Sequence, residues 1–171
     1  CKPLFDSEWK GVPTIICHAQ EHSTSDIPDI FDVALPVEEP GEISPRQLGD
    51  YNVTSIHIPF FIKETIELMQ NLMPTMNKLA FISDNRFICT LARKQIEQVC
   101  REHFPDLELM QLTYPAIGTE TLLKSLSEYG QEAGVLYYSW INTSSSNNSG
   151  YYPHERIHNL IADVSQTPVF T

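Results

Sequence analysis

His154 and His158 have the most specific spacing for chemistry in this sequence, because with Glu155 they form an H-E-x-x-H motif. On a helix, the two imidazoles would lie one turn apart and could bind Zn²⁺, with the glutamate as general base. Pro153 places the motif in the first turn of its helix, and Arg156 puts a cation between the two ligands. Few residues follow His158 from which a third ligand could come. We therefore expect an ordinary first helical turn and no bound metal, with a small zinc hydrolase as an alternative.

Other motifs of cofactor and nucleophile chemistry do not occur in the sequence. It contains no G-x-G-x-x-G, no P-loop and no G-x-S-x-G, which dinucleotide binding, NTP binding and α/β-hydrolase catalysis require. The four cysteines show no C-x-x-C spacing and are too few for a disulfide scaffold, so we expect buried free thiols at Cys1, Cys17, Cys89 and Cys100. The sequence therefore predicts a protein with no catalytic residue and no cofactor.

The charge balance argues against two classes of partner. Lys and Arg number 11 and Asp and Glu number 22, which gives a formal net charge of −11. Such a chain repels phosphate backbones and anionic lipid, so neither nucleic-acid binding nor membrane-surface binding is expected. No run of about 18 apolar residues could span a bilayer, and no signal peptide is visible. Because the chain opens on Cys1 and not on Met, we expect it to be a processed or excised piece of a longer protein.

Strands and helices alternate through the second part of the chain, from residue 56 onward. Apolar residues at helical spacing predict four helices, over 61–73, 86–103, 119–129 and 153–164. Short apolar runs predict four strands, over 78–84, 107–114, 133–141 and 168–170. Strands separated by such helices form βαβ units with right-handed crossovers, so we expect a parallel sheet covered on both faces. The predicted fold class is α/β, a three-layer Rossmann-like or flavodoxin-like lobe.

The first part of the chain is less regular. Prolines and glycines interrupt a polar sequence over 18–55, which predicts mostly loop. Two short apolar runs stand out before residue 56, a predicted strand over 12–17 and a weaker one over 31–35. We therefore divide the chain into a segment 1–55 and a regular lobe 56–171.

Ligands of open parallel sheets bind outside the carboxyl ends of the strands. In this sequence the rule selects three segments that follow predicted strands, 83–86, 114–116 and 139–142. Asp84 and Arg86 supply a carboxylate and a guanidinium beside a helix N-terminus, which could hold a polar or anionic small molecule by paired hydrogen bonds. The alternative is that Ser83 or Asp84 only caps the helix.

The order of segments over residues 11–171 resembles a known family. The matching stretches are Val53-Thr54-x-Ile56, Leu72-Met73-Pro74, Leu79-Ala80-Phe81-Ile82-Ser83-Asp84-Asn85, Phe104-Pro105-Asp106-Leu107-Glu108 and Thr167-Pro168-Val169-Phe170. They resemble the extracytoplasmic sensor domains of bacterial membrane histidine kinases that are related to ABC-transporter substrate-binding proteins. The resemblance implies a type I periplasmic-binding-protein fold, with two Rossmann-like lobes around a ligand cleft. Residues 56–171 would then be most of the second lobe, and residues 1–55 a partial first lobe and hinge segment.

The resemblance also implies a ligand site. The family's ligand loop after the first strand of this lobe falls on Asp84, Asn85 and Arg86, and the loop after the third strand falls on Ser139 and Trp140. The indole face of Trp140 could stack on a ring of the ligand, and a core position is the alternative. We expect Arg86 at the surface, so that Arg86→Ala weakens ligand binding and leaves stability almost unchanged.

Together these expectations describe a non-catalytic sensor module, the ligand-binding part of a two-component histidine kinase on the periplasmic side of the bacterial inner membrane. Its partners would be a small polar or anionic ligand and the membrane-anchored parent protein, with a homodimer left open and no nucleic acid. Ligand binding would select a closed arrangement of the lobes and so bias the kinase. The first alternative is a free solute-binding protein of an ABC transporter, which has the same fold; the second is the zinc hydrolase.

Overall fold

The structure is a computed structural model, and it describes residues 11–19, 22–23, 41–42, 52–57, 59–114, 116–141 and 154–171. The chain forms two compact units, one from Cys1–Ser25 and Glu38–Phe60 and the other from Asp26–Val37 and Phe61–Thr171. Each unit is described by itself below. The strand predicted over 31–35 and the loop predicted over 142–150 lie outside the described residues.

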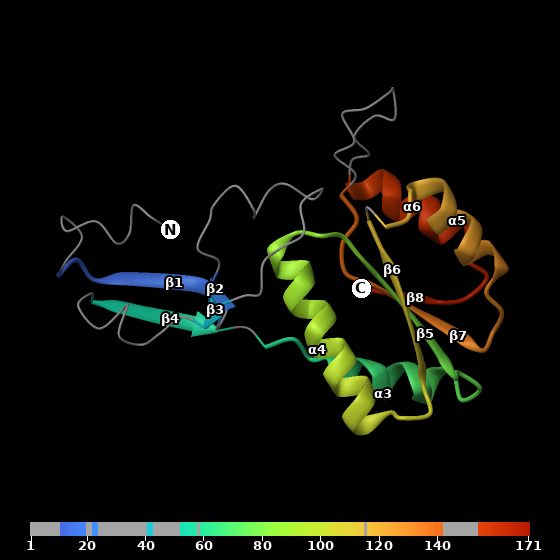
Figure 1. The fold of residues 1–171 in the computed structure, drawn as a ribbon, viewed down its shortest axis with the longest axis horizontal. Coiled ribbons are helices and arrows are strands. Elements are labelled where there is room, and N and C mark those ends of the chain that lie inside the picture. Colours follow the sequence, from blue (N-terminus) through green and yellow to red (C-terminus); the bar gives the residue numbers. More distant parts are fainter. Residues whose placement is uncertain are drawn as a thin grey trace. The chain divides into compact units, whose positions relative to one another are not determined.

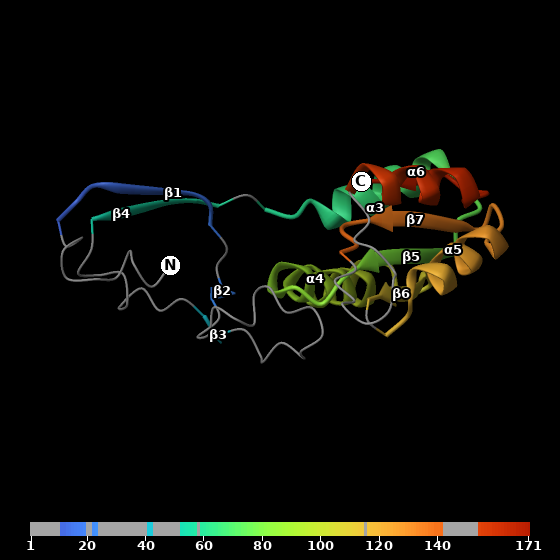
Figure 2. The same cartoon turned by 90° about the horizontal axis from the view of Figure 1, so that it is seen from above.

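The first unit contains a two-stranded parallel sheet, in which β1 (Thr14–Ala19) lies beside β4 (Val53–His57) in both Figure 1 and Figure 2. Two further strands, β2 (His22–Ser23) and β3 (Gly41–Glu42), form a short antiparallel pair. The strand predicted over 12–17 is confirmed by β1. The predicted boundary after residue 55 falls inside β4, whereas the chain passes from one compact unit to the other after Ser25, Val37 and Phe60.

The second unit is built on a four-stranded parallel sheet. Its strands are β5 (Lys78–Ser83), β6 (Glu108–Thr113), β7 (Ala133–Tyr137) and β8 (Val169–Phe170). They pair in the order β6-β5-β7-β8, and every pairing is parallel, as the sequence predicts. Figure 2 shows β6, β5 and β7 alongside one another. β7 ends at Tyr137, earlier than predicted, and the backbone N–H groups of Tyr138 and Ser139 then both donate to the carbonyl of Ile82.

Four helices cover this sheet, α3 (Ile62–Leu72), α4 (Phe87–His103), α5 (Thr119–Glu128) and α6 (His154–Val164). Figure 1 shows α3 and α4 on one side of the sheet and α5 and α6 on the other. The architecture is therefore three-layered α/β, compatible with a Rossmann-like lobe, and the four predicted helices are confirmed. No helix in the described part of the chain is long and apolar enough to cross a membrane.

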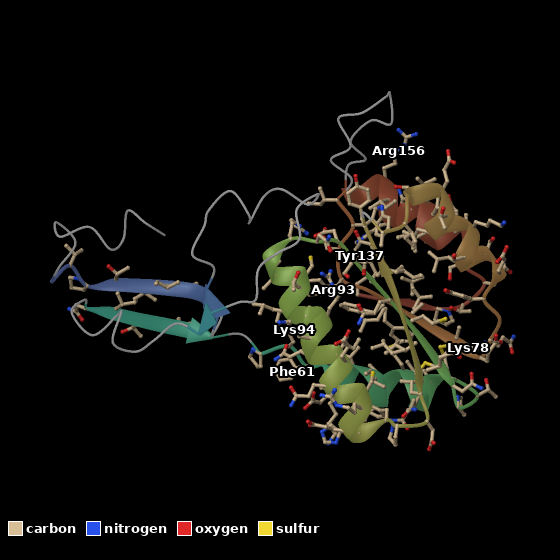
Figure 3. All side chains as sticks on the ribbon, in the orientation of Figure 1. Phe61, Lys78, Arg93, Lys94, Tyr137 and Arg156 are labelled. Atoms are coloured by element: carbon tan, nitrogen blue, oxygen red, sulfur yellow. The ribbon has the colours of Figure 1, made fainter. Side chains whose placement is uncertain are left out.

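The core occupies both sides of β5, whose residues are buried from Leu79 to Ser83. On the side of α5 and α6, one cluster of buried residues comprises Ala80, Ile82, Leu122, Leu126, Val135, Tyr137, Trp140, Ile157 and Ile161. Because neighbouring strand residues point to opposite faces, Leu79 and Phe81 belong to the other side, with Ile66 and Met69 of α3. Figure 3 shows side chains filling the space on both sides of the sheet.

Gly134 of β7 allows the chain before β5 and helix α3 to approach the sheet closely. A Cβ at this position would overlap the Sδ of Met76 and lie 2.7 Å from the Cε of Met69. A larger residue there would have to displace both methionines, and overpacking of this kind costs about 1–3 kcal/mol.

Candidate ligand-binding site

The candidate site lies at the point in the sheet where the chain changes the direction in which it adds strands. From β5 the chain passes first to β6 on one side and later to β7 on the other side. The carboxyl ends of β5 and β7 therefore flank the topological switch point, where open parallel sheets bind their ligands. Asp84 directly follows β5, and Ser139 follows β7 by two residues.

Asp84 is the structural centre of this site. It is fully buried, and its carboxylate accepts hydrogen bonds from the backbone N–H groups of Arg86 (3.0 Å) and Ile141 (3.1 Å). The Nε–H of Arg86 also donates to both carboxylate oxygens, at 3.0 and 3.2 Å. Burial acts to raise the pKa of Asp84, but hydrogen bonds with Arg86 and Cys89 outweigh it and hold the pKa below its ordinary value. The residue is therefore a buried, fully engaged carboxylate.

Arg86 connects the two strand ends. While its Nε–H is held by Asp84, its Nη2–H donates to the hydroxyl of Ser139 and lies 3.9 Å from the Sγ of Cys89. Burial acts to lower the pKa of Arg86, but the hydrogen bond and charge of Asp84 raise it above its ordinary value. Only 28% of the side chain is exposed. Arg86 is therefore partly buried and less exposed than the sequence led us to expect, because its guanidinium bonds to a buried carboxylate.

Arg93, from the second turn of α4, is a second guanidinium at this edge. Its Nη1 donates to the Ser83 hydroxyl at 3.2 Å and to the backbone carbonyl of Asp84, and its Nη2 donates to the side-chain oxygen of Asn85 at 3.1 Å. Nη2 also donates to the hydroxyl of Thr90 at 3.0 Å. Burial lowers the pKa of Arg93, but an arginine remains a cation at neutral pH. Arg93 therefore fixes the turn that carries Asp84 and Asn85.

Arg93 is not among the site residues predicted from the sequence. A signal for it exists, because residues 86 and 93 are seven apart, which places them on the same face of a helix two turns from each other. Four of the five predicted residues, Asp84, Asn85, Arg86 and Ser139, come together in the structure with Arg93. We call these five residues and Ser83 the switch-point cluster.

Trp140, the fifth predicted residue, lies in the core. Its side chain is 2% exposed, its indole N–H donates to the hydroxyl of Thr119 at 3.1 Å, and the ring of Tyr114 packs edge-on at 5.8 Å. The structure therefore offers no exposed indole face to a ligand. Trp140 occupies a core position, which was the alternative to stacking on a ligand. Tyr114 begins the predicted edge segment 114–116, and its side chain packs against the same core.

The H-E-x-x-H motif begins helix α6, since His154 is its first residue. The side chains of His154 and Glu155 lie outside the described residues. The ring of His158 packs edge-on against Tyr137 of β7, with centroids 4.3 Å apart. Among the residues that the structure describes, no three His, Cys, Asp or Glu side chains are grouped so that they could hold a metal ion.

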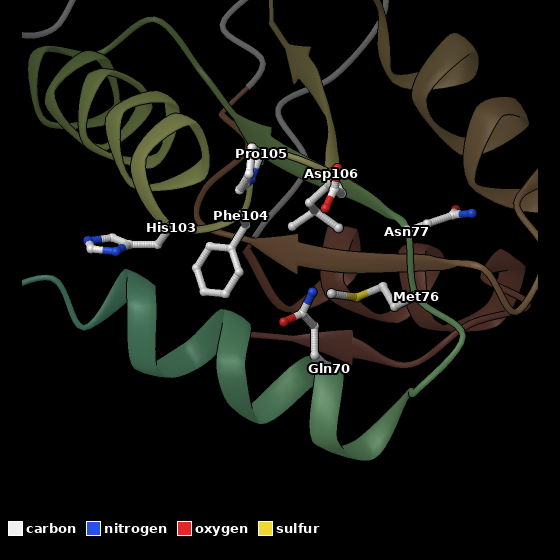
Figure 4. Close-up of a pocket in the computed structure, with 8 residues that line it drawn as sticks. Gln70, Met76, Asn77, His103, Phe104, Pro105 and Asp106 are labelled. Atoms are coloured by element: carbon white, nitrogen blue, oxygen red, sulfur yellow. The ribbon is translucent and has the colours of Figure 1, made fainter.

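A pocket of about 300 Å³ lies at the other end of the sheet, beside the amino ends of β5 and β6 (Figure 4). Its lining residues come from α3, from the segment before β5, from the end of α4 and from the turn that follows it: Gln70, Met76, Asn77, His103, Phe104, Pro105, Asp106 and Leu107. None of them belongs to the switch-point cluster. We assign the candidate site to the cluster, because convergent charged groups with shifted pKa values are typical of functional sites.

Comparison with known proteins adds no assignment. Neither protein-family models, nor curated proteins, nor solved structures contain a match to this chain.

Proposed function

We propose that this chain is a non-catalytic ligand-sensing module, the extracytoplasmic part of a two-component sensor histidine kinase, and that it binds a small polar molecule at the switch-point cluster. The observation that supports this proposal is the meeting of Arg86, Asp84 and Ser139 from two different strand ends at one point of the sheet edge. In a doubly wound sheet this is the position where ligands bind.

A type I periplasmic-binding-protein lobe is the finer form of the proposal. The strand order β6-β5-β7-β8 and the two helices on each face agree with such a lobe, and so does the order of motifs in the sequence. In this scheme residues 61–171 supply one wall of a cleft, and the ligand draws a second wall toward it. A ligand with higher affinity for the closed form would shift the population toward that form and change the state of the kinase.

A thermal-shift screen of the full chain against amino acids, sugars and small anions tests ligand binding. A ligand present at about 100 times its Kd stabilises the native state by about 2.7 kcal/mol, which in a chain of this size raises Tm by about 5–10 °C. The shift should fall to about half or less in Arg86→Gln, and it should persist in Asp106→Asn, which alters the pocket at the other end of the sheet. A screen in which no compound raises Tm, or in which Asp106→Asn alone removes the shift, contradicts the proposed site.

The sensor role has its own test in the gene that encodes the chain. A hydrophobic span followed by a kinase core downstream of residue 171 supports it. A stop codon directly after residue 171 would contradict the sensor role and indicate a free solute-binding protein instead.

A further inference from the structure

The charge of the switch-point cluster is opposite in sign to that of the chain. The whole sequence carries a formal net charge of −11, yet the cluster contains two guanidinium groups and one carboxylate. An acidic chain that gathers two cations at one sheet edge creates a local positive potential. This potential favours an anion over a cation or a neutral molecule.

The single carboxylate of the cluster is not available to a ligand. Asp84 is fully buried, and its two oxygens already accept hydrogen bonds from Arg86 and from the backbone N–H of Ile141. A ligand ammonium group or sugar hydroxyl would need such an acceptor at the surface of the site. The side-chain oxygen of Asn85 is likewise engaged, by Arg93. The cluster therefore offers a ligand mainly donors.

Donors remain on the outer edge of Arg86. Its Nε and Nη2 atoms are engaged, and no acceptor for its Nη1 occurs among the residues that the structure describes. The Arg86 side chain is 28% exposed, so it is partly open to solvent. A guanidinium donates from a rigid planar fork that matches the oxygen spacing of carboxylate and phosphate groups.

The start of α4 adds to the same preference. Arg86 is its N-cap residue, no side chain caps the helix there, and the first turn holds no acidic residue. The first turn of this 17-residue helix therefore has no side-chain cap, and the Asp84 carboxylate bonds to the backbone N–H of the N-cap residue itself.

We infer that the chemical group recognised at the switch-point cluster is an oxyanion, a carboxylate or a phosphate, bound through the Nη1 edge of Arg86. This inference rests on the proposed function and narrows it to one class of ligand. Arg93 acts as a positioning residue, because its bonds go to the turn and not outward. Asp84 holds Arg86 in place, so that a single guanidinium joins the buried Asp84 carboxylate to the bound oxyanion.

The test is an NMR titration of the full chain labelled with ¹⁵N. The titrants are sodium acetate, sodium phosphate and acetamide, and chloride keeps the ionic strength constant. Acetate or phosphate should shift the backbone amides of Arg86, Ile141 and the first turn of α4 in a saturable manner, and neutral acetamide should not. Acetate alone indicates a carboxylate ligand, and phosphate alone indicates a phosphate ester. Because this measurement needs no variant, it stands even if a substitution at Arg86 impairs folding.

Two variants extend the test. Arg86→Gln should weaken the binding of the anion that produces the shift at least about tenfold, which corresponds to a loss of roughly 1.4 kcal/mol of charged hydrogen bonding. Arg101→Gln is the matched control, because it removes the same charge from the exposed last turn of the same helix, and it should bind as the wild type does. Equal anion affinity in Arg86→Gln, or no saturable shift at the cluster, would overturn the inference. If the anions fail while a neutral sugar from the thermal-shift screen shifts the same amides, the oxyanion class is wrong and the proposed function stands.

Discussion

Removal of the Arg86 side chain should destabilise the folded protein, and the structure gives the size of the effect. In Arg86→Ala, the buried carboxylate of Asp84 keeps two backbone donors, the N–H groups of residue 86 and Ile141, but loses the guanidinium that bonds to both of its oxygens. Breaking a buried ion pair costs about 3–5 kcal/mol, and a lost charged hydrogen bond about 1.5–3 kcal/mol. Because 28% of the Arg86 side chain is exposed and water can partly replace it, we expect a loss of about 2–3 kcal/mol.

Urea unfolding measures this loss, followed by far-UV circular dichroism and by tryptophan fluorescence, to which the buried Trp140 contributes. The midpoint should fall while the slope m stays unchanged, since a changed slope would indicate a different denatured state. Arg101→Ala, which removes an exposed arginine from the same helix, should cost less than about 1 kcal/mol.

A double-mutant cycle separates the ion pair from other effects of the substitution. If Asp84 and Arg86 stabilise the fold through each other, the double variant Asp84→Ala/Arg86→Ala should be at least about 1 kcal/mol more stable than the sum of the single effects predicts. Stability of Arg86→Ala within about 0.5 kcal/mol of the wild type would refute this reasoning, because the carboxylate would then have no need of its cation.

Three further predictions follow from the same structure. The pKa of Asp84 is lowered in the folded state, so its ionised form stabilises the protein above the unfolded pKa of about 3.9, and this contribution is lost as the pH falls through the lower folded pKa. Below about pH 4, the urea midpoints of Asp84→Asn should therefore fall less steeply with decreasing pH than those of the wild type. Parallel pH curves for the two proteins would contradict this prediction. Burial raises the pKa of the Cys89 thiol to about 12 and that of the Cys100 thiol to about 11, whereas Cys17 is exposed. Iodoacetamide should therefore label Cys17 in the native protein, and Cys89 and Cys100 only after unfolding, which peptide mass spectrometry can show. Trp140→Phe should cost about 1–3 kcal/mol through the lost indole hydrogen bond and packing, yet leave the affinity for any ligand found by thermal shift within about twofold; a large loss of affinity at unchanged stability would instead support a ligand contact.

The architecture of the second unit could be predicted because its elements carry strong periodic patterns. The helix α3 buries Ile62, Ile66 and Met69 at a spacing of four and three residues, and the strand β5 is a short apolar run between polar ends. Helices between such strands leave a parallel sheet with right-handed crossovers as the favoured topology. The strand β4 was not anticipated, since five residues in a loop-like region give a weak signal, although Val53, Thr54 and Ile56 are the β-branched types that strands favour.

The sequence predicts which residues lie near the candidate site, but it does not predict where their side chains point. The rule for strand ends correctly placed Asp84, Arg86 and Ser139 at one edge, but it gives no side-chain directions. Ser139 and Trp140 are neighbours, and neighbouring residues of an extended chain point to opposite sides, so one reaches Arg86 while the other enters the core. Arg93 was missed for a related reason, because hydropathy separates polar from apolar helix positions and does not show which polar side chains fold back onto a turn.

The geometry of Arg86 explains why an arginine, and not a lysine, suits this position. Its guanidinium has three nitrogen atoms in one plane, of which Nε faces Asp84, Nη2 faces Ser139, and Nη1 has no acceptor among the described residues. A lysine ammonium is a point charge that could neutralise Asp84 but could not also hold Ser139 and a ligand in a fixed plane. The same side chain therefore joins the ends of β5 and β7 and keeps one nitrogen atom without an acceptor among the described residues, so the stability of this sheet edge and the proposed binding of an oxyanion would depend on one group.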